Sequence, residues 1–152
     1  MPNYKGHLVG GAAAFGIVLY CIKSKNPTII TALEWLCCAL LGALFPDIDT
    51  KSKGQKIFYR MVFFSVVVLL IQMRIRAVAF VSLLALSPLL IRHRGITHSL
   101  WFIVFLCSSA LVYAHIFAPA YAQLVFFDAL FFCAGAISHL WLDLGLRRML
   151  RI

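Results

Sequence analysis

Charged residues are scarce in this chain of 152 residues, and acidic residues are the scarcest. Only 12% of the residues are charged, and Asp and Glu together number 5. This is too little polar material to cover a water-soluble globule, and a sequence that is 63% hydrophobic is not intrinsically disordered either. The composition therefore predicts a single all-α domain over residues 1–152 that crosses a membrane several times.

Cysteine patterns that hold a fold together or bind a metal are also missing. The five cysteines are an odd number, lie inside apolar runs, and show neither CxxC nor Cys-His spacing. A disulfide framework and a thiolate zinc site are therefore not indicated. The N-terminal stretch offers no convincing cleavage site for a signal peptide, so we expect the first apolar segment to remain in the protein.

Six apolar stretches are present, separated by Pro, Gly and charged residues. They cover residues 7–22, 28–45, 57–72, 75–91, 98–117 and 123–146. Several are at the short end of what spans a membrane, because a helix needs about 20 residues to cross a hydrocarbon core about 30 Å thick. The prediction is a multi-pass transmembrane helical bundle with four to six membrane helices.

Basic residues outnumber acidic ones, 14 to 5, which gives a formal net charge of +9. Such an excess suits either a nucleic-acid-binding protein or the loops that orient membrane helices. If all six stretches cross, ten of the 14 basic residues lie on the side of the two termini. The positive-inside rule then places both termini in the cytoplasm, in a cytoplasmic (inner) membrane. Because the basic residues are scattered over every helix end, we expect membrane lipids as partners and no nucleic acid.

The same alternation brings most of the residues able to do chemistry to the cytoplasmic face. Four separate segments contribute His7, Asp47 with Asp49, the run from His93 to His98, and His139 with Asp143. The remaining acids, Glu34 and Asp128, and the remaining histidine, His115, fall nearer the opposite face.

Two of these segments have the spacing of metal ligands. Asp47 and Asp49 follow Pro46, and an extended or turn backbone there would let both carboxylates approach one cation or bridge two. His139 and Asp143 are four residues apart, so on a helix they share one face. The alternatives are ordinary turn chemistry for the first pair and a hydrogen-bonded intramembrane pair for the second.

The run His93-Arg94-Gly95-Ile96-Thr97-His98-Ser99 is the most informative segment. Gly95 permits a tight backbone, and Thr97 as an N-cap would place His98 in the first helical turn, where an imidazole stays neutral and able to bind a metal. Arg94 has the planar fork that grips an anionic oxygen. The alternative is a basic cytoplasmic loop with two incidental histidines.

Taken together, four histidines and three aspartates without a cysteine indicate a divalent-metal centre that could hold two ions, with water as the nucleophile. Zn²⁺ is the first choice of ion, and Mn²⁺ or Fe²⁺ the second. A serine hydrolase is disfavoured, because Ser99 beside His98 is not accompanied by a G-x-S-x-G elbow.

Four blocks of the sequence resemble the YdjM-like family of inner-membrane metal-dependent hydrolases, one group of which is LexA-regulated. The blocks are Lys5-Gly6-His7-Leu8, Leu44-Phe45-Pro46-Asp47-Ile48-Asp49, the run from His93 to Ser99, and Ser138-His139-Leu140-Trp141-Leu142-Asp143. They occur in the family's order and extend over most of the chain. The resemblance implies an enzyme similar to zinc-dependent phospholipase C, and hence a phosphoester substrate such as a phospholipid head group.

The resemblance also implies roles for individual residues. The metal ligands would be His7, Asp47, Asp49, His98, His139 and Asp143. His93 would be a further ligand or a proton shuttle, and Arg94 would support a ligand or clamp the phosphate. From the chemistry alone, Asp47 or Asp49 could bridge the metals or accept a proton.

The predicted function is therefore a membrane-bound metal-dependent hydrolase that acts on a phosphoester. The leading alternative is a non-catalytic membrane protein in which the same polar cluster binds a structural metal or seals the bundle, and which works through a partner. A transporter would need ionisable residues that line a path at mid-membrane depth, whereas these residues gather at one end.

Overall fold

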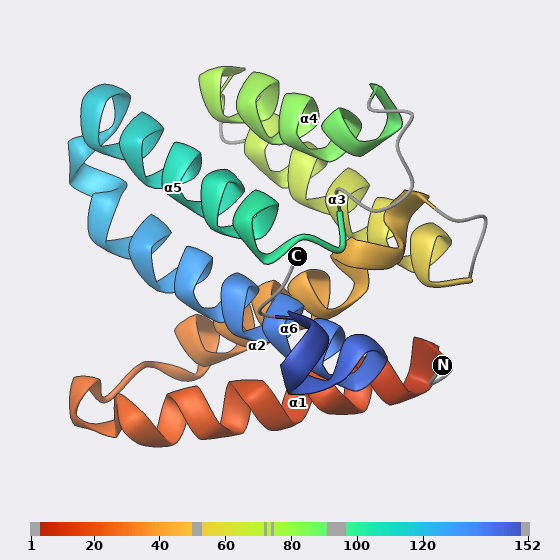
Figure 1. The fold of residues 1–152 in the computed structure, drawn as a ribbon. Coiled ribbons are helices and arrows are strands. Elements are labelled where there is room, and N and C mark those ends of the chain that lie inside the picture. The colour runs from red at the N-terminus through yellow and green to blue at the C-terminus, as the bar shows by residue number, and fades with distance from the viewer. Residues whose placement is uncertain (1–3, 50–52, 72, 74, 91–96, 150–152) are drawn as a thin grey trace.

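The computed structural model describes residues 4–49, 53–71, 73, 75–90 and 97–149, and these ranges contain six α-helices and no strand (Figure 1). The helices are α1 Tyr4–Cys21, α2 Ile29–Leu44, α3 Lys53–Ile71, α4 Ile75–Leu90, α5 Leu100–Phe117 and α6 Ala122–Met149. Three short 3₁₀ helices join them: η1 Lys23–Lys25, η2 Phe45–Asp49 and η3 Pro119–Tyr121. The predicted all-α fold is confirmed, and each predicted stretch corresponds to one helix.

Four helical segments are long and apolar enough to cross a membrane. They are Ile29–Ile48, Lys53–Ile71, Leu100–Phe117 and Pro119–Gly145. α4 has 16 residues and is about 24 Å long, which is shorter than a hydrocarbon core of about 30 Å. α1 has 18 residues but includes a lysine, a histidine and four glycines. Four spans and two further helices agree with the predicted four to six.

α2 and α6 form the centre of the bundle. α1 packs against both of them, and α5 packs against α6. α3 and α4 pack on each other as a hairpin and reach the rest of the described chain mainly through η2 and the end of α2. Figure 1 shows this hairpin at the top of the view, apart from α1 and α2 at the bottom.

The backbones of α2 and α6 touch at two glycines. A methyl group on Gly42 would collide with the carbonyl oxygen of Phe132, and one on Gly135 would collide with that of Ala39. Small residues of this kind allow membrane helices to approach closely, since helix association in lipid depends on close packing. The contact sets the register of the two helices whose ends carry Asp47, His139 and Asp143.

η2 is held in place by aromatic packing and by one hydrogen bond. Phe45 is buried, and its ring centroid lies 6.0 Å from that of Phe58 on α3 and 6.3 Å from that of Phe102 on α5. The Gln55 side chain on α3 donates a hydrogen bond of 2.7 Å to the carbonyl oxygen of Ile48. These contacts fix the short helix that follows α2 at the junction of α3, α5 and α6.

The glycine contact predicts opposite effects for the same substitution at two sites. Gly42→Ala inserts a methyl group against the α6 backbone, and we expect it to lower the free energy of unfolding by about 1–3 kcal/mol, as overpacking does. Gly16→Ala in α1 meets no atom within 4 Å and should be neutral or stabilise by up to about 1 kcal/mol through helix propensity. Unfolding in mixed micelles, followed by circular dichroism, measures both. Equal destabilisation by the two variants would contradict a close backbone contact between α2 and α6 at Gly42.

Candidate metal centre

Polar side chains from four separate segments meet at one end of the bundle. His7 comes from the start of α1, Asp47 from η2, His98 from the turn before α5, and His139 with Asp143 from the last part of α6. Figure 1 shows the start of α5, the region of η2 and the end of α6 close together near the middle of the view.

Four of these residues form a group that could hold a metal ion: Asp47, His98, His139 and Asp143. One nitrogen or oxygen of each residue lies within 4.8 Å of the corresponding atoms of the other three. His139 Nε2 is 3.3 Å from Asp143 Oδ2 and 3.7 Å from Asp47 Oδ1. His98 Nε2 is 3.7 Å from the same oxygen of Asp47 and 3.9 Å from Asp143 Oδ2. The two imidazoles and the two carboxylates therefore alternate around one small space.

These separations are longer than hydrogen bonds and close to those of ligands around one ion. Charge-assisted N–H···O bonds are about 2.7–2.9 Å long. Ligand atoms about 2.0–2.1 Å from a tetrahedral ion are instead about 3.3–3.4 Å apart. The shortest pair, His139 with Asp143 at 3.3 Å, matches this value, and the pairs at 3.7–3.9 Å exceed it by only a few tenths of an ångström.

The ring of His139 is oriented by the backbone of α2. Its Nδ1 lies 2.7 Å from the carbonyl oxygen of Ala43, and a carbonyl only accepts hydrogen bonds, so Nδ1 is the donor. Nε2 then carries the lone pair and points at the two carboxylates. This nitrogen is buried and has no hydrogen-bond partner among the described residues. A carbonyl on the second ring nitrogen is the arrangement that holds metal-ligating histidines in the required tautomer.

His7 lies behind the four-residue group. Its ring stacks on that of His139, with centroids 3.8 Å apart and planes at 19°. His7 Nε2 is 3.5 Å from Asp143 Oδ1, so the Asp143 carboxylate faces His7 with one oxygen and the other histidines with the second. The predicted ligand His7 is thus adjacent to the cluster, where it supports His139 and Asp143.

The cluster has a closed side and an open side. The side chains of His7, His139 and Asp143 are at most 3% exposed, whereas that of His98 is 22% exposed and that of Asp47 is 28% exposed. A ligand that reaches the group therefore approaches it past Asp47 and His98.

Two local expectations are wrong. Thr97 is not the N-cap of α5, because that helix begins at Leu100 and its N-cap is Ser99, which has an extended backbone (φ −89°, ψ 127°). Thr97 is buried, and its hydroxyl oxygen lies 3.5 Å from His98 Nδ1, so His98 belongs to the turn before the helix. The backbone at Asp47 is neither extended nor a simple turn, because the 3₁₀ helix η2 continues the winding of α2.

Three predicted functional residues cannot be placed in this group. His93 and Arg94 lie outside the residues that the structure describes, and so does the side chain of Asp49, although its backbone closes η2. Their roles, and the second metal ion that they would help to hold, stay predictions.

The remaining acidic residues and the remaining histidine lie toward the far end of the bundle, as the alternation predicts. Glu34 is near the start of α2, Asp128 is near the start of α6, and His115 is in the last turn of α5. The Asp128 carboxyl group lies beside the Cys38 thiol. All five cysteines are free thiols.

Sequence reasoning missed two parts of the site, because neither involves a polar side chain. The carbonyl of Ala43 orients His139, and Gly42 and Gly135 bring that carbonyl within reach. Glycines within an apolar run were the only available signal, and they do not indicate which helix packs against them.

The cluster constrains the path of the chain across the membrane. It joins the end of α2, the start of α5 and the end of α6, so an even number of crossings separates each from the next. α3 and α4 must therefore leave this face and return to it together, although α4 is short. By the same reasoning η1 lies at the opposite face from η2.

Comparison with known proteins identifies one family. A sequence profile of the YdjM inner membrane protein family matches residues 1–148. No match is found among curated proteins or among solved structures.

The crossing pattern can be tested by cysteine labelling. In a variant without the five native cysteines, we expect Ser24→Cys in η1 and Lys53→Cys at the start of α3 to lie on opposite faces. A membrane-impermeant maleimide added to intact cells should label Ser24→Cys, and should label Lys53→Cys only after the cells are opened, if the cluster faces the cytoplasm. Labelling of both positions from the same side would contradict the geometry.

Proposed function

The chain belongs to the YdjM family of inner membrane proteins, and on that premise we propose that it is a membrane-embedded, metal-dependent hydrolase of lipid phosphoesters. The observation that carries the proposal is the half-open cluster of Asp47, His98, His139 and Asp143 at one end of the bundle. Catalytic metal sites leave room for water or substrate, whereas structural zinc sites are enclosed by their protein ligands.

The residues present fit a divalent ion. Two imidazoles and two carboxylates without a thiolate suit Zn²⁺, and also Mn²⁺ or Fe²⁺. His139 Nε2 and Asp143 Oδ1 are buried without a hydrogen bond, and such groups cost about 1–3 kcal/mol each unless something else satisfies them. A cation among the four ligand atoms is the simplest partner for these two buried atoms, because both belong to residues of the group.

An ion held there would act as a Lewis acid on a phosphoryl oxygen and would make water a nucleophile near neutral pH. The protein's own groups would position the ion and accept the proton. His139 and Asp143 form the rigid, buried side of the site, fixed by Ala43 and His7. Asp47, on the open side, would accept a proton from the attacking water, and His98 borders the entrance with it.

A phosphoester is favoured as the substrate by charge and by location. The chain carries a formal net charge of +9, and Lys5 and Lys53 are exposed at helix ends near the cluster. Basic residues next to a membrane surface attract anionic lipid head groups, each contributing about 1 kcal/mol. We propose that Arg94 and His93 add to this phosphate site and that the cluster faces the cytoplasm, where the excess of basic residues would also place it.

Metal binding gives the first test. Protein purified in a mild detergent should contain roughly one or two divalent ions per chain by elemental analysis. His98→Ala and Asp47→Ala each remove one ligand and should lower the metal content at least about tenfold at limiting metal. His115→Ala, at the other end of α5, is the matched control and should keep it. Wild-type metal content in both cluster variants would show that the site is elsewhere.

Turnover separates an enzyme from a protein with a structural metal. With mixed vesicles of anionic and zwitterionic phospholipids, we expect release of phosphate or head group that stops with a chelator and returns with added metal. Asp47→Asn should lose at least about 100-fold in kcat, because it removes a carboxylate that binds metal and accepts the proton. His115→Ala should retain full activity. A protein that holds its full metal but turns over none of a broad panel of lipids would favour the structural alternative.

A further inference from the structure

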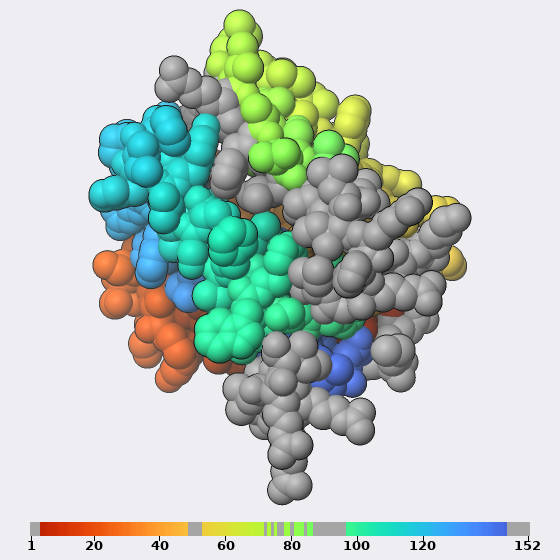
Figure 2. Space-filling model, turned by 45° about the horizontal axis from the view of Figure 1, so that its top comes forward, coloured from red at the N-terminus to blue at the C-terminus, as the bar shows by residue number. Residues whose placement is uncertain are grey.

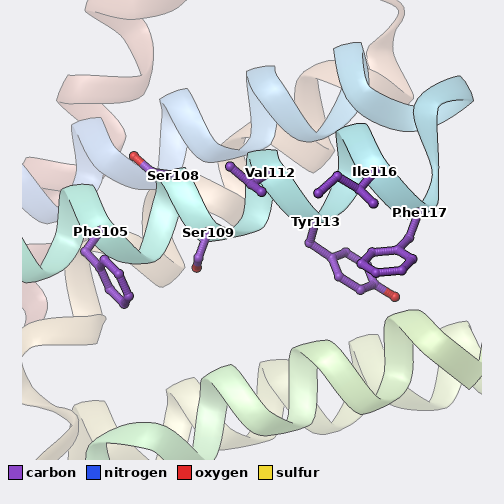
Figure 3. Close-up of a pocket in the computed structure, with 7 residues that line it drawn as sticks. All are labelled: Phe105, Ser108, Ser109, Val112, Tyr113, Ile116 and Phe117. Carbon is purple, nitrogen blue, oxygen red and sulfur yellow. The ribbon is translucent and has the colours of Figure 1, made fainter.

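An open groove of about 390 Å³ runs along α5, lined by side chains between Phe105 and Phe117. Figure 3 shows the rings of Phe105, Tyr113 and Phe117 projecting from α5 toward α4. In Figure 2, α5 is visible along its length below α4. The groove exists because α5 packs on α6, whereas α4 packs on α3 and η2.

The groove has a largely apolar surface, although Ser108, Ser109 and Tyr113 belong to its lining, and it lies within a membrane-spanning segment. Leu100–Phe117 is long and apolar enough to cross the membrane, so its surroundings there are hydrocarbon. Ser109, one of the few polar residues in the lining, donates its hydroxyl to the carbonyl oxygen of Leu106 at 2.7 Å and offers that proton to no ligand. A hydrocarbon chain is therefore the occupant that matches both the lining and the solvent.

The groove lies on a face of α5 that leads toward the cluster. Phe105 and Val112 both line the groove and are seven residues apart, so they lie on nearly the same side of α5. Trp101, four residues before Phe105, is on this side too and is exposed in the first turn of the helix, directly after the turn that carries His98. A molecule that lies along this face of α5 thus reaches the proposed metal site with its end.

The depth of the groove indicates how long such a chain must be. Trp101 and Trp141 are exposed at the cluster end, as aromatic residues are at a membrane interface. At 1.5 Å per residue, Phe105 lies about 8 Å and Phe117 about 26 Å along the helix from Leu100, where α5 begins. Half of a hydrocarbon core is only about 15 Å, so the groove continues past the bilayer midplane.

We infer that this groove binds the hydrocarbon chain of the lipid substrate, and that the chain is longer than one leaflet, as in a polyprenyl phosphate. The inference rests on the proposed function, because it assumes that the hydrocarbon chain in the groove and the phosphate at the cluster belong to the same lipid molecule. The head group lies at the open side of the cluster, and the chain follows α5 through the near leaflet into the far one. An acyl chain of ordinary length fills only the near part of the groove.

Photocrosslinking tests the binding without requiring turnover. The probe is a long polyprenyl phosphate with a photoreactive group at the far end of its chain, incorporated in phospholipid vesicles. It should label α5 between Ser109 and Phe117, in the wild type and also in the metal-site variant Asp47→Ala. Val112→Trp fills the groove and should lower this labelling about tenfold. Val104→Trp changes a similarly exposed valine of the same helix outside the groove and should not lower it.

Kinetics then link the groove to the cluster. We expect Val112→Trp to raise KM for the polyprenyl phosphate about tenfold and to leave the hydrolysis of a water-soluble aryl phosphate unchanged. Equal melting temperatures of the two tryptophan variants show that both are folded. Labelling of α5 that Val112→Trp leaves intact overturns the inference, and so does equal efficiency on diacyl and polyprenyl substrates. Labelling as expected without any turnover supports the groove as a lipid site and overturns the proposed function instead.

Discussion

The close approach of α2 and α6 is the contact on which the rest of the site depends. At Gly42 and Gly135 the two backbones touch, and no side chain larger than hydrogen fits between them. The carbonyl of Ala43, one residue after the first glycine, comes within 2.7 Å of His139 as a result. If the helices were farther apart by the width of a methyl group, this hydrogen bond would be lost. The ring of His139 would then have no fixed tautomer, and the stacked ring of His7 would have no firm support.

The membrane surroundings make the exact placement of these polar groups important. In hydrocarbon a polar group has no water to turn to, so ionisable residues must find partners within the protein. This chain gathers His7, Asp47, His98, His139 and Asp143 at one end of its helices and leaves the long apolar faces to the membrane. Even there, the described partners of His139 and Asp143 do not satisfy every buried polar atom. Buried polar atoms that lack hydrogen-bond partners and lie next to an accessible side of the protein are typical of a binding site and not of a structural network.

Much of the fold and of the cluster could be predicted from the sequence, because lipid imposes simple rules. Apolar runs of fixed length define the helices, and strict alternation of their ends assigns His7, Asp47, His98 and the pair on α6 to one face. The prediction failed where tertiary contacts decide the local backbone. The N-cap of α5 is Ser99 and not the predicted Thr97, because Thr97 is buried beside His98. Helix propensities carry no information about that burial.

The groove was beyond prediction for a related reason. The groove exists because α5 packs on α6 while α4 packs on α3. The periodicity of a sequence does not show which helices pack together. The apolar face of α5 reads in the sequence as an ordinary membrane helix. Only the arrangement of helices in space shows that part of this face borders a hollow.

The α3–α4 hairpin supplies no described residue to the cluster. It is inserted between η2 and the turn that carries His98, and both of its ends return to the same face. The molecule thus divides into a four-helix unit that would carry the chemistry and a two-helix unit that forms a wall beside it. Mutations in this hairpin that spare the contacts of Gln55 and Phe58 with η2 would reshape what lies against α5 without moving a ligand atom. Under the proposed function, evolution would therefore alter selectivity and reactivity in this architecture as two separate traits.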